Sequence, residues 1–197
     1  MKAIFKDNIK SYLLIFLIGI IAGLSVVLFL ELPNNDLWTF SYWSSKTFGF
    51  WIFSTSLIVL LSEKRKVAII NTAMYIFIMF LMSAIYMTFC LYWKGYSPFN
   101  SLMEVSLNNI YGWLIYSLPS AIICGVLGAI LWDGRKNNIH GRILCILPAI
   151  FILIEVSFLF YNVIIEHTKL FSAITDLICF ILYIKFLRKN IKNLTIF

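Results

Sequence analysis

Long apolar runs alternate with short polar segments along the chain. The apolar runs predict helices at about residues 11–30, 48–62, 67–91, 110–132, 143–165 and 170–187. A membrane-spanning helix needs about 20 predominantly apolar residues, and the run at 48–62 reaches that length only if residues before Phe48 join it. The pattern therefore predicts an all-α fold: a polytopic membrane helix bundle with six transmembrane helices, forming a single transmembrane domain over residues 1–197.

Composition points to the same class. Of the 197 residues, 61% are hydrophobic and 13% are charged, whereas soluble domains are about 45–50% apolar and about 25% charged. Six spans with their connections use nearly all of this length, so we expect no separate soluble domain. A net charge of +7 would suggest nucleic acid in a soluble protein. Here the basic residues lie in short segments between apolar runs, so we expect membrane lipids as the surroundings and no nucleic-acid partner.

The basic residues are distributed unevenly between the two predicted sides of the membrane. One side collects thirteen of them: Lys2, Lys6, Lys10, Lys64, Lys66, Lys136, Lys185, Lys189, Lys192, Arg65, Arg135, Arg142 and Arg188. The other side has only Lys46, Lys94 and Lys169. Since cytoplasmic loops are enriched in Lys and Arg, this asymmetry predicts a multi-pass protein of the cytoplasmic membrane with both termini inside and an even number of spans.

The outer loop at residues 31–46 is rich in aromatic side chains mixed with Asn and Asp. Two interpretations stand. Aromatic rings commonly settle at the membrane surface as a belt. Alternatively, the loop also covers a site that faces outward.

Acidic residues interrupt the apolar runs at 143–165 and 170–187. At about 100° per residue, Asn162 and Glu166 fall within about 20° of the helix face that carries Glu155. Asp176 belongs to a similar polar stripe on the next helix. Because consecutive helices joined by a short loop lie close together, we expect Glu155 and Asp176 to be near each other at comparable depth.

A charge at the bilayer centre costs at least about 2.5–3.5 kcal/mol on insertion scales, so such residues usually face the bundle interior and often mark ligand or proton paths. We therefore predict a ligand-binding polar cavity open to the outside. Its predicted lining is Glu155, Asn162, Asp176, Tyr116 and Asn109. An equally good alternative is that a protonated Glu155 bonds to a neighbouring helix without any ligand.

Small residues recur at four-residue spacing in two of the predicted helices. The run at 110–132 carries Ala121, Gly125 and Ala129, and the run at 11–30 carries Gly19 and Gly23. Such ladders let helices approach closely. They predict either packing within the chain or docking of a membrane protein partner.

The parts of the common catalytic and metal sites are missing from the sequence. His140 and His167 are the two histidines, and the predicted topology puts them on opposite sides of the membrane. The four cysteines are isolated, and no GxSxG, HExxH or Walker motif occurs. We expect no enzyme activity, no cofactor and no metal.

Three stretches carry a resemblance to a known family. The segments FGFWIF, NNIYGWLIYSLPSAIICGVLGAILW and IEVSFLFYN resemble the spaced Trp, Pro-to-Gly and Glu features of an uncharacterised bacterial family of six-helix integral membrane proteins. The resemblance implies the fold and a membrane location.

The length, helix count, long first outer loop and small-residue motif of the first helix are also similar in architecture to S-components of energy-coupling-factor transporters. That resemblance implies that Gly19 and Gly23 dock a coupling subunit. It also implies that Glu155, Asn162 and Asp176 face a small ligand.

The start MKAIFKDNIKSY reads like that of ABC-type export permeases. Those proteins have a long coupling segment between their second and third helices, and SEKRK is too short to supply one. The leading hypothesis is a small-molecule-binding subunit or small transporter. The alternatives are a non-transporting interaction protein, such as an immunity or assembly factor, or a permease-like subunit.

Overall fold

The computed structural model describes residues 2–33, 35–42, 47–93, 95, 102–136 and 138–190. Within these ranges the side chains of 91, 102, 103, 105–110, 112, 113 and 116 are not described. The described chain is helical. Its helices are α1 (Ile9–Glu31), α3 (Gly49–Leu61), α4 (Arg65–Trp93), α5 (Leu102–Trp132), α6 (Ile139–Glu166) and α7 (Leu170–Asn190), with a short 3-10 helix, η1, at Asp133–Arg135.

Five helices are long and apolar enough to cross a membrane: α1, α4, α5, α6 and α7. They agree with the predicted runs, although several extend beyond them at one or both ends. This architecture is compatible with an integral membrane protein. The predicted helix at 48–62 forms as α3 but has only 13 residues, or about 20 Å at 1.5 Å per residue. Since a hydrocarbon core is about 30 Å thick, the described helix α3 does not by itself cover that thickness.

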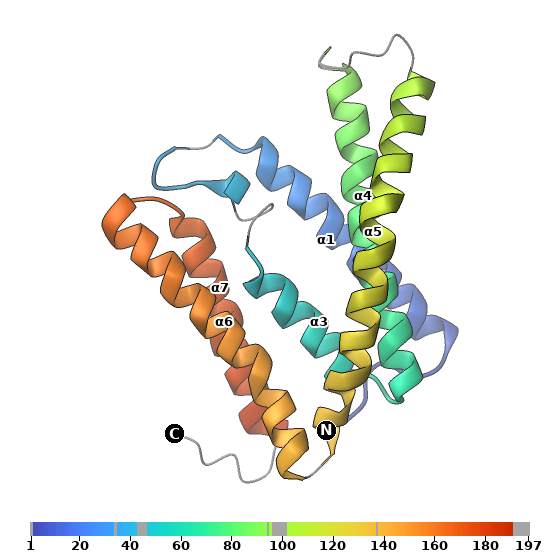
Figure 1. Cartoon of the computed structure of the whole chain (residues 1–197), viewed down its shortest axis with the longest axis vertical. Helices are drawn as coiled ribbons and strands as arrows, with labels where there is room; N and C mark the ends of the chain where they lie inside the picture. The colour runs from blue at the N-terminus through green and yellow to red at the C-terminus, as the bar shows by residue number, and fades with distance from the viewer. Residues whose placement is uncertain are drawn as a thin grey trace.

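The helices are arranged as two arms with α3 between them (Figure 1). Helices α4 and α5 run antiparallel and form one arm, and α6 and α7 form the other. Helix α1 packs against α4, while α3 contacts both arms. The short helix is therefore the element through which the two arms meet over much of their length.

Helix α1 approaches α4 through its two glycines. A Cβ at Gly19 would lie 3.1 Å from the Cβ of Ile78, and one at Gly23 would collide with the carbonyl of Met79. The Ser83 hydroxyl donates a hydrogen bond of 3.0 Å to the Gly23 carbonyl. Gly19 and Gly23 thus face a helix of the same chain.

The small residues of α5 also face α4. A Cβ at Gly125 would lie 3.5 Å from Cγ2 of Ile69. Ala121 is buried in the same core as residues of α1 and α4. The Ala129 carbonyl accepts a hydrogen bond of 3.1 Å from Nε of Arg65 at the start of α4.

The C-terminal end of α3 is joined to the N-terminal segment and to η1. Phe5 pairs with Ser62 in an isolated parallel bridge. The Ser62 carbonyl accepts hydrogen bonds from the Trp132 indole, at 3.1 Å, and from the Arg135 guanidinium. The last described turn of α7 lies at this same end (Figure 1). Basic segments that are distant in sequence are therefore gathered at one end of the molecule.

Candidate functional site

The candidate site lies at the N-terminus of α3. The first N–H groups of any α-helix have no partner within the helix. Here the backbone N–H of Phe48, which precedes Gly49, donates a hydrogen bond of 2.7 Å to Oε1 of Glu155. A carboxylate from the middle of α6 therefore caps the start of α3.

Asp176 approaches the same helix start from α7. Its side chain is fully buried, and its carboxyl group lies directly against Gly49, where a Cβ would come within 2.5 Å of Oδ2. Only a glycine leaves room for the carboxyl group at this position. The sequence reasoning did not identify Gly49, although a glycine at the start of an unusually short helix was an available signal.

The two predicted acids are therefore brought together. Glu155 and Asp176 both lie at the positive end of the α3 macrodipole, which favours negative charge. The backbone N–H groups of Gly49 and Phe50 face the Asp176 carboxylate, and that of Gly49 also faces Glu155. Among the described residues, both oxygens of Asp176, Oε2 of Glu155 and Oγ of Ser172 are buried without a hydrogen bond of regular geometry. No described basic residue forms an ion pair with either acid. Within the described ranges, the two acids therefore share the N–H donors of one helix start and have no basic partner.

Asn162 is buried at 2% exposure, but it does not join the acids. Its amide nitrogen donates to the carbonyl of Phe158, at 2.9 Å, within its own helix. The side chains of Tyr116 and Asn109, which the sequence also assigned to the cavity, lie outside the described residues.

A groove of about 500 Å³ opens beside Glu155. Its lining is Tyr42, Phe48, Ile52, Phe151, Ile154, Glu155 and Phe158. Burial first, and then the negative charges of Glu155 and Glu166, raise the pKa of the Tyr42 hydroxyl. Most of the side chains that line the groove are aromatic, and one of them, Glu155, carries a carboxylate.

The Lys169 side chain lies beside two of the residues that line this groove. Its ammonium nitrogen is 4.7 Å from the centroid of the Tyr42 ring and 5.7 Å from that of Phe158. It also forms an ion pair of 3.5 Å with Glu166. The ammonium group of Lys169 thus lies over two of the aromatic rings that line the groove.

The segment that follows α1 is attached to the start of α7 beside the groove. The Lys169 N–H donates to the Thr39 hydroxyl at 3.0 Å, and the Leu170 N–H donates to the Leu37 carbonyl at 3.0 Å. These bonds hold the segment where Tyr42 lines the groove.

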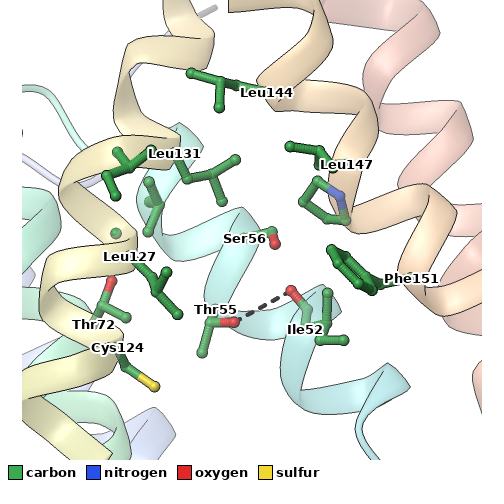
Figure 2. Close-up of a pocket in the computed structure, with 14 residues that line it drawn as sticks. Ile52, Thr55, Ser56, Thr72, Cys124, Leu127, Leu131, Leu144, Leu147 and Phe151 are labelled. Carbon is green, nitrogen blue, oxygen red and sulfur yellow. Dashed lines mark hydrogen bonds between the residues drawn. The ribbon is translucent and has the colours of Figure 1, made fainter.

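A second cleft, of about 380 Å³, lies between α5, α3 and α6 (Figure 2). Leu127 and Leu131 of α5 face Leu147 and Phe151 of α6 across it. Thr55 donates to the Ile52 carbonyl at 3.3 Å, so its hydroxyl is used by its own helix. Ile52 and Phe151 line both this cleft and the groove beside Glu155. The groove and the apolar cleft therefore adjoin at these two side chains.

Comparison with protein-family models, curated proteins and solved structures finds no match to this chain. The fold and the site define its class only as a helical protein whose five long apolar helices are compatible with multi-pass membrane insertion. Among the described residues no group of three or more His, Cys, Asp or Glu is placed to hold a metal ion. A more particular function has to be argued from the acids at the α3 N-terminus.

Proposed function

We propose that this protein is a small-molecule-binding subunit or small transporter of the cytoplasmic membrane, with Glu155 and Asp176 at the core of its binding site. In this proposal both termini are cytoplasmic, because the basic segments lie at the opposite end of α3 from the acids. The acids and the groove then face the outer half of the membrane.

The observation that carries the proposal is the surplus of buried acceptors at the start of α3. One carboxylate suffices to cap Phe48, and Glu155 does so with a single oxygen. A second acid, Asp176, is fully buried at the same helix start and has no hydrogen bond of regular geometry among the described residues, although the N–H groups of Gly49 and Phe50 face it. Its burial adds a desolvation cost that capping by Glu155 does not explain. A ligand that supplies donors or positive charge would account for it.

The strongest competing explanation is that both acids only fix the position of α3. Helix caps stabilise by about 1 kcal/mol, and carboxylates near a helix N-terminus add to this through the macrodipole. Glu155→Gln separates the two roles, because a glutamine carbonyl still accepts from Phe48 while the negative charge is lost. A purely structural Glu155 tolerates this change, whereas a binding residue does not.

The test is native mass spectrometry of the protein extracted gently from its own membranes. We expect a reproducible small-molecule adduct on the wild-type chain that is absent from Glu155→Gln. The matched control is Glu63→Gln, which neutralises an exposed carboxylate at the opposite end of α3 and should keep the adduct. A bare chain or a lipid-only complex in all three proteins would contradict the proposal.

Gly19, Gly23 and Gly125 contact α4 of the same chain, which supports packing within the chain at these positions for the proposal and for the interaction-protein alternative alike. The connection between α3 and α4 spans only residues 62–64. It is too short to be the long coupling segment that the permease-like alternative requires. A stoichiometric protein partner in the same mass spectra would favour the interaction protein over the proposal made here.

A further inference from the structure

We propose that the groove beside Glu155 binds a monovalent organic cation, an ammonium group carried on an apolar body. The inference rests on the proposed function and narrows its ligand to one chemical class. It is carried by the charge of the acid pair, the aromatic walls of the groove and the position of Lys169.

The first step is the charge at the start of α3. Two carboxylates face one helix N-terminus, whose macrodipole is equivalent to about half a positive charge. No described basic residue pairs with either of them, and in the described part of the chain three of their four oxygens are buried without a hydrogen bond of regular geometry. The charge that complements this arrangement is positive, so an anionic ligand is disfavoured and a cation is favoured.

The second step is the wall chemistry. Tyr42, Phe48, Phe151 and Phe158 supply four aromatic rings around the groove, and Ile52 and Ile154 supply the remaining apolar surface. Aromatic faces attract ammonium groups, and they do so more strongly where water is excluded. An inorganic cation needs a shell of oxygen ligands, which these walls do not offer. The walls therefore favour an organic cation over a metal ion.

The third step is Lys169, a residue of this chain whose ammonium group already lies where a bound organic cation would lie. Its ammonium group lies over Tyr42 and Phe158, both of which line the groove. Its side chain is only 19% exposed, so the ammonium is largely withdrawn from solvent. A free organic cation that used the same rings would compete with Lys169 for them.

The apolar cleft between the arms has room for the rest of such a ligand. Because Ile52 and Phe151 line both the cleft and the groove, an apolar body attached to an ammonium near Glu155 would lie against side chains that border the cleft. This geometry favours a cation with an apolar or aromatic substituent over a small, strongly hydrated one.

The test uses benzyltrimethylammonium and its neutral carbon isostere, neopentylbenzene, with the full-length protein in nanodiscs of zwitterionic lipid. Binding is measured by calorimetry. We expect the cation to bind at least roughly tenfold more tightly than the isostere, because only the cation interacts with the rings and the carboxylate through its charge. Equal binding of the two probes, or binding of neither, would overturn the inference.

Three variants and one control variant, Glu63→Gln, locate the effect. Glu155→Gln should weaken the cation roughly tenfold and leave the isostere unchanged, while Glu63→Gln should change neither. Tyr42→Leu should weaken the cation roughly threefold to tenfold, and it provides a second readout if Glu155→Gln is poorly folded. Lys169→Gln should tighten the cation, because it removes the tethered competitor. Unchanged cation affinity in both Glu155→Gln and Tyr42→Leu would overturn the inference.

The failure of this inference is distinguishable from failure of the proposed function. If native mass spectra show a neutral or anionic adduct that depends on Glu155, the binding function stands and the cationic class is wrong. If no adduct depends on Glu155, the proposed function fails, and the cationic class fails with it.

Discussion

The two ends of α3 are stabilised by opposite charges but in different ways. At the C-terminal end, the Ser62 carbonyl is shared by the Trp132 indole and the Arg135 guanidinium. At the N-terminal end, Glu155 accepts from Phe48, and Asp176 is buried against the same N–H groups without a hydrogen bond of regular geometry among the described residues. Both ends complement the helix macrodipole. Only the N-terminal end has charged acceptors beyond those that capping requires, and this difference marks it as the candidate binding site.

The surroundings of the two ends differ as well. The C-terminal end is closed by the N-terminal segment, where the Glu63 N–H donates to the Phe5 carbonyl at 2.8 Å. The N-terminal end opens onto the groove of about 500 Å³ beside Glu155. A contact that only holds helices together does not require an open groove, whereas a small-molecule binding site does.

The largest expected effect comes from filling the space between Gly49 and Asp176. Gly49→Ala places a methyl group where the Asp176 carboxyl group lies, so we expect a loss of about 3 kcal/mol, the upper range for an overpacked core. Thermal unfolding in detergent measures it. Gly125→Ala is the matched control, because its Cβ would meet neighbours only at 3.5 Å or more and should change stability little. Equal stability of the two variants would contradict the contact.

The next largest effect on stability is expected from removing the Glu155 cap at the N-terminal end of α3. Glu155→Leu leaves the N–H of Phe48 without its acceptor, and we expect a loss of about 2 kcal/mol. Glu155→Gln should unfold close to the wild-type temperature because it keeps an acceptor. If both variants lost the same stability, the charge of Glu155 would itself be structural, and the distinction between the two ends would weaken.

The smallest effect is expected at the opposite end. Arg135→Gln removes one of two donors to the Ser62 carbonyl, and the Trp132 indole remains. We expect a loss of about 1 kcal/mol and no change in ligand adducts, measured by thermal unfolding and native mass spectrometry together. Loss of an adduct in this variant would show that the two ends do not act separately.

Much of the helical architecture was predictable from the sequence. Apolar runs of about 20 residues identified the five long helices because burial in a bilayer or bundle demands that length and composition. The polar stripes also placed Glu155 and Asp176 on faces that meet. This worked because a helical face is a local property of the sequence, with a period of 3.6 residues.

The role of α3 was not predictable in the same way. Its run of apolar residues predicted a helix, but its start at Gly49 between two acids from α6 and α7 depends on contacts more than 100 residues apart in sequence, such as Phe48 with Glu155. The same holds for Tyr42, whose place in the groove depends on hydrogen bonds between the segment that follows α1 and the start of α7. Hydropathy carries no information about such pairings.

The most direct test of the central claim compares wild-type and Glu155→Gln proteins for two properties in one preparation: thermal unfolding and the native mass spectrum. If the acids at the start of α3 form a binding site, Glu155→Gln unfolds near the wild-type temperature and lacks a small-molecule adduct that the wild-type protein carries. Identical adduct spectra for the two proteins would contradict the claim and leave Glu155 as a cap for α3.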